Sequence, residues 1–71
     1  MFDPVRVKWV QTALNILGAS PALDVDGEYG PLTTAAVQEF QKANSLVVDG
    51  WAGDATQFAL QTALSKIKTG T

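Results

Sequence analysis

Four carboxylates are the side chains best able to do acid–base chemistry in this 71-residue chain: Asp26, Glu28, Glu39 and Asp49. A glycoside hydrolase needs two carboxyl groups about 5 to 9.5 Å apart across a cleft. Glu39 falls inside a predicted helix, on a face that we expect to meet solvent. Since a chain this short buries little volume, the sequence argues against catalysis and favours a binding module.

The chain contains no histidine and no cysteine. This excludes disulfides, zinc sites built from thiolate and imidazole, cysteine nucleophiles and Ser-His pairs. An EF-hand calcium loop also fails. Placing Gly27 at the sixth loop position puts Thr33 at the twelfth, where a bidentate glutamate is required. We therefore predict no metal and no cofactor.

The composition describes a compact globule. Hydrophobic residues make up 46% of the chain and charged residues 17%, a balance that argues against disorder. A net charge of -2 with five basic residues offers no surface for nucleic acid or an anionic membrane. No signal peptide is visible at the start of the sequence. We predict a single monomeric domain over residues 1–71 that binds neither nucleic acid nor membrane.

One segment of the sequence occurs twice, 23 residues apart. VDGEYGPLTTAAV begins at Val25 and VDGWAGDATQFAL begins at Val48, with six identical positions. Asp-Gly favours a tight turn, because glycine accepts positive φ and the aspartate can bond to backbone amides two residues on. Each copy therefore predicts a turn that leads into a helix, with Gly30 and Gly53 at the helix N-caps.

Capping residues and apolar spacing predict three helices, over about residues 4–17, 31–43 and 54–68. Asp3 caps the first helix and Gly18 ends it. The fold class is all-α, a small three-helix orthogonal bundle with two Asp-Gly turn-to-helix repeats. The residues expected to face its core or anchor its loops are Val7, Trp9, Val10, Ala13, Leu14, Ile16, Leu17, Leu23, Val25, Ala36, Val37, Phe40, Ala43, Leu46, Val48, Phe58, Ala59, Leu60, Ala63, Leu64 and Ile67.

Two Asp-Gly turns at this spacing, flanked by these helix patterns, resemble the peptidoglycan-binding domain family. The resemblance is carried by VKWVQTALNILG from Val7, DGEYGP from Asp26 with Thr33, Ala36-Val37, Phe40-Gln41, Leu46, Asp49-Gly50, Gly53 and Thr56. The chain departs from the family at Asp54, where proline is usual, and at Trp51 and Ala52, where aliphatic residues are common. The resemblance implies a small non-catalytic module attached to a bacterial or phage cell-wall hydrolase, such as an endolysin or amidase.

It also implies that the partner is peptidoglycan, through its glycan strand or its peptide stem, in the cell wall, periplasm or extracellular space. Sugars offer hydroxyls, N-acetyl groups and flat C–H faces, so a binder needs an exposed ring beside short polar groups. The candidate ligand-binding residues are Asp26, Gly27, Tyr29, Thr33, Gln41, Asn44, Asp49, Gly50, Trp51 and Thr56. Turn and cap roles also explain the aspartates, glycines and threonines, and Tyr29 could equally cover the core.

A protein-interaction module is the alternative hypothesis. The stripe formed by Trp9, Ala13 and Ile16 could be an exposed apolar patch that docks on a partner protein rather than part of the core. Co-sedimentation with insoluble peptidoglycan separates the two hypotheses, because only a wall-binding module should pellet with it.

Overall fold

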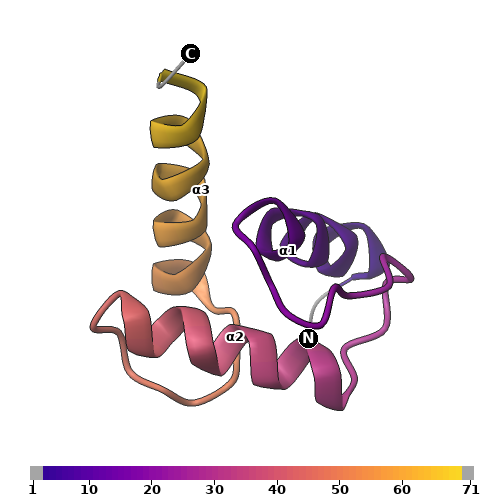
Figure 1. Cartoon of the computed structure of the whole chain (residues 1–71). Helices are drawn as coiled ribbons and strands as arrows, with labels where there is room; N and C mark the ends of the chain where they lie inside the picture. The colour runs from indigo at the N-terminus through magenta and orange to yellow at the C-terminus, as the bar shows by residue number, and fades with distance from the viewer. Residues whose placement is uncertain (1–2, 70–71) are drawn as a thin grey trace.

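The computed structural model describes residues 3–69, and the side chains as far as residue 67. Its three helices are α1 (Pro4–Ile16), α2 (Pro31–Ala43) and α3 (Asp54–Thr69). Residues 3–69 contain no strand, so the predicted all-α class is confirmed. In Figure 1, α3 stands upright beside one end of α2, and its last turns project beyond the other two helices.

Helix α1 begins and ends where its capping residues predict. The Asp3 carboxylate accepts a hydrogen bond of 2.7 Å from the backbone N–H of Arg6, and Pro4 occupies the first helical position. At the other end, the Leu17 N–H bonds to the Ala13 carbonyl at 3.0 Å. Gly18 follows with φ +97°, a left-handed conformation that glycine adopts without strain.

The other two helices also begin at the predicted residues. Gly30 is the N-cap of α2 in an extended conformation, and it makes no side-chain capping bond. Asn44 caps the other end of α2, since its backbone N–H and its side-chain amide both bond to the Phe40 carbonyl oxygen. Asp54 opens α3 and places a carboxylate in the first turn, where the helix dipole favours negative charge.

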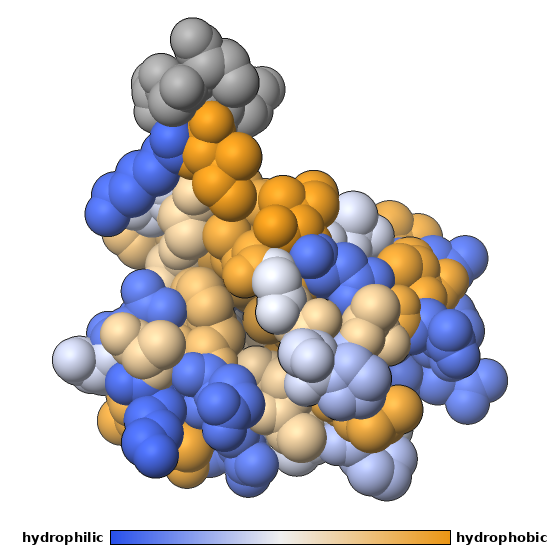
Figure 2. All heavy atoms as spheres, viewed as in Figure 1, coloured by the Kyte–Doolittle hydropathy of each residue, from blue (hydrophilic) through white to orange (hydrophobic). Residues whose placement is uncertain are grey.

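Residues from all three helices meet in one core. Figure 2 shows apolar and pale side chains gathered where the helices meet, with hydrophilic groups toward the outside of this face. The buried hydrophobic residues are Val7, Val10, Ala13, Leu14, Leu23, Val37, Ala52 and Leu60. Trp9, Leu17, Ala36, Phe40 and Leu64 are partly buried and pack against this cluster. The sequence predicted all of these core positions except Ala52, and those predictions are confirmed.

Several other predicted core residues lie on the surface, and Phe58 is the clearest correction. Its side chain is 71% exposed, because the buried face of α3 follows Thr56 and Leu60 at helical spacing and Phe58 falls between them. Ile16 and Ile67 are exposed near the ends of their helices. Three further predictions were wrong in the same way: Val25, Ala43 and Val48 are exposed.

The apolar stripe of Trp9, Ala13 and Ile16, which was considered for protein interaction, is mostly buried or packed against the core. Ala13 is buried and Trp9 packs against the core. The Arg6 guanidinium carbon lies 5.9 Å from the centroid of a Trp9 ring, a distance typical of a cation–π contact. Only Ile16 of this stripe is exposed, so the three residues do not form a continuous docking patch.

Candidate functional site

The first Asp-Gly turn, called here the first corner (residues 26–30), is closed by a glutamine from α1. Gln11 is 1% exposed. Its side-chain oxygen accepts hydrogen bonds from the N–H groups of Asp26 and Gly27, both at 3.1 Å. Its Nε2 donates to Asp26 Oδ1, the Glu28 carbonyl and Thr33 Oγ1 at 3.0 to 3.1 Å. One amide thus ties α1, the corner and the start of α2 together.

The second corner (residues 49–53) is closed in the same way by Gln41 of α2, which is also 1% exposed. The Gln41 oxygen accepts from the N–H groups of Asp49 at 3.1 Å and Gly50 at 2.9 Å. Its Nε2 donates to Asp49 Oδ1, the Trp51 carbonyl and Thr56 Oγ1 at 2.9 to 3.1 Å. The two corners therefore have matching polar interiors.

Each aspartate completes its own turn through a backbone bond. Oδ1 of Asp26 accepts from the Glu28 N–H, and Oδ1 of Asp49 accepts from the Trp51 N–H, both at 2.9 Å. These bonds favour the ionised carboxylate. The Glu28 N–H and then the Gln11 amide lower the pKa of Asp26 below its ordinary 3.8. The Trp51 N–H and then the Gln41 amide lower the pKa of Asp49 likewise.

Tyr29 joins the two corners to each other. Its hydroxyl donates a hydrogen bond of 2.7 Å to the Gly50 carbonyl and accepts one of 3.1 Å from the Ala52 N–H. Burial raises the pKa of Tyr29 above its ordinary 10.0. The Tyr29 ring is tilted against a Trp51 ring at a centroid distance of 5.2 Å. Trp51 remains 46% exposed, so this ring is open to solvent while Tyr29 is half-buried.

The ten candidate ligand-binding residues thus differ in accessibility. Thr33, Gln41 and Thr56 are buried, and their polar atoms bond inside the protein. Gly27 and Gly50 adopt φ of +78° and +74°, which serves the turns. Asn44 is exposed and caps α2. Of the two rings, Trp51 is the more exposed to solvent. The corners, with Tyr29 between them, position it.

Gln11 was not among the predicted site residues, although it does for the first corner what Gln41 does for the second. A signal for it exists in the sequence. Val7 precedes Gln11 by four residues, as Val37 precedes Gln41, and both valines are buried. The separation between these helical pairs is 30 residues, whereas the turns repeat at 23. If the sequence is aligned with itself at one offset, the alignment therefore matches either the turns or the valine–glutamine pairs, but not both.

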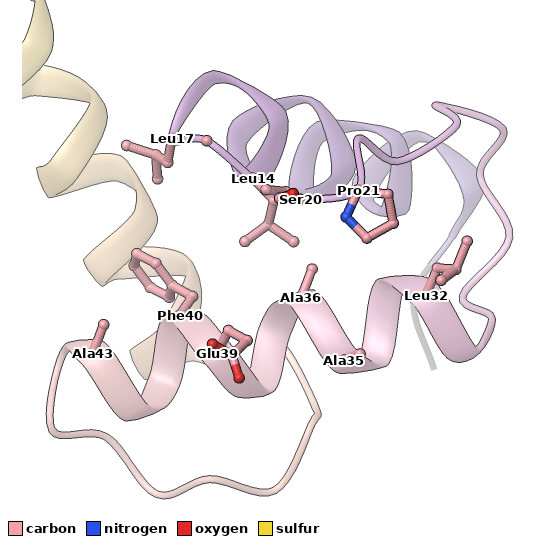
Figure 3. A pocket seen from close by; sticks show the side chains of 12 residues that line it. Leu14, Leu17, Ser20, Pro21, Leu32, Ala35, Ala36, Glu39, Phe40 and Ala43 are labelled. Carbon is pink, nitrogen blue, oxygen red and sulfur yellow. The ribbon is translucent and has the colours of Figure 1, made fainter.

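A groove of about 400 Å³ lies between α1 and α2 and was not predicted from the sequence. We call it the α1–α2 groove. In Figure 3, Leu14 of α1 and Ala36 of α2 point toward each other across it, with Phe40 and Leu32 toward opposite ends of α2. Its lining residues are Leu14, Leu17, Gly18, Ala19, Ser20, Pro21, Leu32, Ala35, Ala36, Glu39, Phe40 and Ala43. Ser20 and Glu39 carry the only polar side chains in this lining.

The described part of the chain lacks two kinds of feature. None of its helices is long and apolar enough to cross a membrane. Among the same residues, no three carboxylates are grouped so that they could hold a metal ion.

One known family matches most of this sequence. A sequence model for the family described as a peptidoglycan binding domain matches residues 4–60. The chain belongs to the peptidoglycan-binding domain family. The matched residues of this peptidoglycan-binding domain contain both corners, both glutamines and the whole α1–α2 groove. The part of α3 beyond residue 60 lies outside the match.

One curated relative of this peptidoglycan-binding domain is the zinc D-Ala-D-Ala carboxypeptidase of Streptomyces albus G. The two sequences are 54% identical over 39 residues. That alignment covers 55% of this chain and 15% of the carboxypeptidase, so the similarity concerns a small part of the relative. No solved structure matches the chain significantly.

Proposed function

We propose that this domain is a non-catalytic module that binds cell-wall peptidoglycan and holds an attached wall hydrolase at its substrate. The observation that carries the proposal is the family match over residues 4–60. All residues that line the α1–α2 groove lie within this range, and the groove is large enough for a small ligand. The similarity to a carboxypeptidase named for D-Ala-D-Ala supports a role beside an enzyme of this kind. An endolysin or an amidase would likewise need a module that holds it at the wall. The working location is then the cell wall or extracellular space.

Two surfaces are available for the polymer. The α1–α2 groove offers an apolar recess, and Trp51 offers a ring with 46% of its surface exposed. We assign direct contact to these two surfaces. Gln41 is buried and its amide bonds within the protein, and Oδ1 of Asp26 and of Asp49 closes the turns, so we assign these three residues to positioning the corners.

Binding by a single module should be weak. Each hydrogen bond at an exposed surface contributes about 0.5–1.5 kcal/mol net, and the recess is small. A polymer repeats the same ligand many times, and a linked enzyme supplies a second attachment point. Both raise the effective concentration of the module at the wall. Weak individual contacts suit an enzyme that must move along its substrate.

The test is co-sedimentation with purified, insoluble peptidoglycan sacculi. We expect the wild-type chain to pellet with the sacculi. Ala36→Leu, which fills the groove, and Trp51→Ala, which removes the exposed ring, should each pellet less. Phe58→Ser is a matched surface control that should pellet like wild type, since Phe58 is exposed and lies outside both surfaces. Circular dichroism must show that every variant keeps its helices.

A wild-type chain that stays in the supernatant would overturn wall binding and favour a protein partner. Hydrolysis of purified walls by the isolated chain would overturn the non-catalytic assignment. Loss of binding in the Phe58→Ser control as well would mean that neither of the two assigned surfaces is specific.

A further inference from the structure

We infer that the α1–α2 groove accepts the peptide stem of peptidoglycan, and that the Glu39 carboxylate binds an ammonium group of that stem. The inference deepens the proposed function and rests on it. Of the two components of the polymer, glycan and peptide, the groove would bind the peptide, and Glu39 would provide the selectivity.

The lining of the groove suits a short peptide better than a sugar. Ten of its twelve residues have no polar side-chain atom, so the groove supplies few groups that could bond to the hydroxyls of a glycan strand. Gly18, Ala35, Ala36 and Ala43 are small and leave room for a backbone with methyl side chains. Peptidoglycan stems are short peptides that are rich in alanine, and their side chains would be buried against this apolar surface.

The charge in the groove selects for an amine. Glu39 is the one charged residue of the lining, its side chain is exposed, and no basic residue lines the groove. An exposed carboxylate attracts a cation modestly, and among these lining residues Glu39 alone offers that attraction. The stems carry a diamino acid whose second amino group is free wherever the stem is not cross-linked. That ammonium is the complement of Glu39.

The polar atoms of the corners do not compete for this ligand. No residue of either corner lines the groove, and Oδ1 of Asp26 and of Asp49 bonds to the buried glutamine amides within the protein. A glycan strand could still lie against Trp51 while the stem enters the groove. The two components of the polymer would then meet two different surfaces of one domain.

The experiment compares two peptides that differ by one charge. The ligands are acetyl-L-Ala-D-isoglutaminyl-L-Lys-D-Ala with a free side-chain amine and the same peptide acetylated on that amine. A tetramer of N-acetylglucosamine serves as the glycan probe. Each is titrated into the ¹⁵N-labelled chain and followed by NMR. Wild type, Glu39→Gln and a control with the same charge change outside the lining, Asp24→Asn, are compared.

We expect wild type to bind the free-amine peptide about two- to fivefold more tightly than the acetylated peptide, within the range for an exposed ion pair. The backbone amides of Ala36, Glu39 and Phe40 should shift. Glu39→Gln should bind both peptides equally, whereas Asp24→Asn should keep the preference. Because the readout is a ratio within each variant, a general loss of stability does not imitate the result.

Three results would overturn the inference. One is that the glycan tetramer moves the groove amides and the peptide does not. Another is that Glu39→Gln keeps the preference for the free amine. The third is that the peptide moves no groove amide at its highest soluble concentration. If the chain still pellets with sacculi in these cases, wall binding stands and only the stem assignment falls. If it does not pellet, both fall.

Discussion

The Tyr29 hydroxyl lies 2.7 Å from the Gly50 carbonyl oxygen, so a side chain of the first corner completes the backbone of the second. The same hydroxyl accepts the Ala52 N–H, and Ala52 is buried in the core. These residues are more than 20 positions apart in the chain. The phenol therefore makes the two corners one unit and fixes the Tyr29 ring beside the exposed Trp51 ring.

Replacing Tyr29 with phenylalanine removes both bonds and keeps the ring. We expect Tyr29→Phe to lower the free energy of unfolding by about 1–3 kcal/mol, because the Ala52 N–H and the Gly50 carbonyl lose a partner in a partly buried place. Urea unfolding of wild type and Tyr29→Phe measures this difference in the free energy of unfolding. If unfolding is unchanged, the hydroxyl does not hold the corners together.

The same variant should also change the alkaline limit of stability. The pKa of Tyr29 is raised in the folded state, so its stabilising effect is fully present below pH about 10 and is lost as pH rises through the folded pKa. Wild type should lose stability above pH 10 more steeply than Tyr29→Phe. Equal slopes in that range would contradict the assignment.

The buried glutamines should be among the most sensitive polar positions. We expect Gln41→Ala to destabilise the chain by about 3 kcal/mol, because it leaves the Asp49 and Gly50 N–H groups unpaired and opens a cavity. Gln11→Ala should have a similar effect at the first corner. Gln61→Ala, at an exposed position of α3, is the control and should change stability by less than about 0.5 kcal/mol. Thermal and urea unfolding compare the three.

The two aspartates should give the fold part of its acid sensitivity. Their pKa values are lowered in the folded state, so the stabilisation that they provide is present above pH about 4 and is lost as pH falls through the folded values. The double variant Asp26→Asn and Asp49→Asn should be less stable than wild type at pH 7. The difference should shrink as pH falls below 4. A constant difference down to the acid transition would show that ionisation is not the cause.

Gly50 and Gly18 both have positive φ but differ in their surroundings. A Cβ at Gly50 would lie 2.9 Å from Thr34 Cγ2, whereas a Cβ at Gly18 would meet no atom within 4 Å. Gly18→Ala should therefore cost about 1 kcal/mol from backbone strain alone, and Gly50→Ala at least twice as much. Equal losses of unfolding free energy in the two variants would contradict close packing of the second corner on α2.

Most of the fold could be predicted because its signals are local. Asp3, Gly18 and Pro31 mark helix ends through backbone geometry that neighbouring residues determine, and these boundaries are confirmed. Phe58 could not be placed in this way. Whether an apolar side chain on α3 is buried depends on which helix face meets α1, and that is a property of the tertiary arrangement. Leu60 and Phe58 look equally suitable until that arrangement is known.

The candidate site was only partly predictable for the same reason. The turns are visible in the sequence, and the exposure of Trp51 follows from its place in a turn. The role of Gln11 depends on a contact across 15 to 22 residues, and the α1–α2 groove forms from residues of α1, the 17–21 segment and α2. Such a groove has no signature in any one segment, because it is the space that small residues leave when two helices pack.

The groove shares no residue with the two glutamine-centred hydrogen-bond clusters, and Leu14 is the one buried residue in its lining. Five of its twelve lining residues, Leu14, Leu17, Ala19, Ala36 and Phe40, also belong to the core or pack against it, whereas the exposed Ala35 and Glu39 do not. Evolution, or an engineer, can exchange Glu39 or Ala35 to suit a different wall chemistry without first finding compensating changes elsewhere. One scaffold would then suit several wall chemistries.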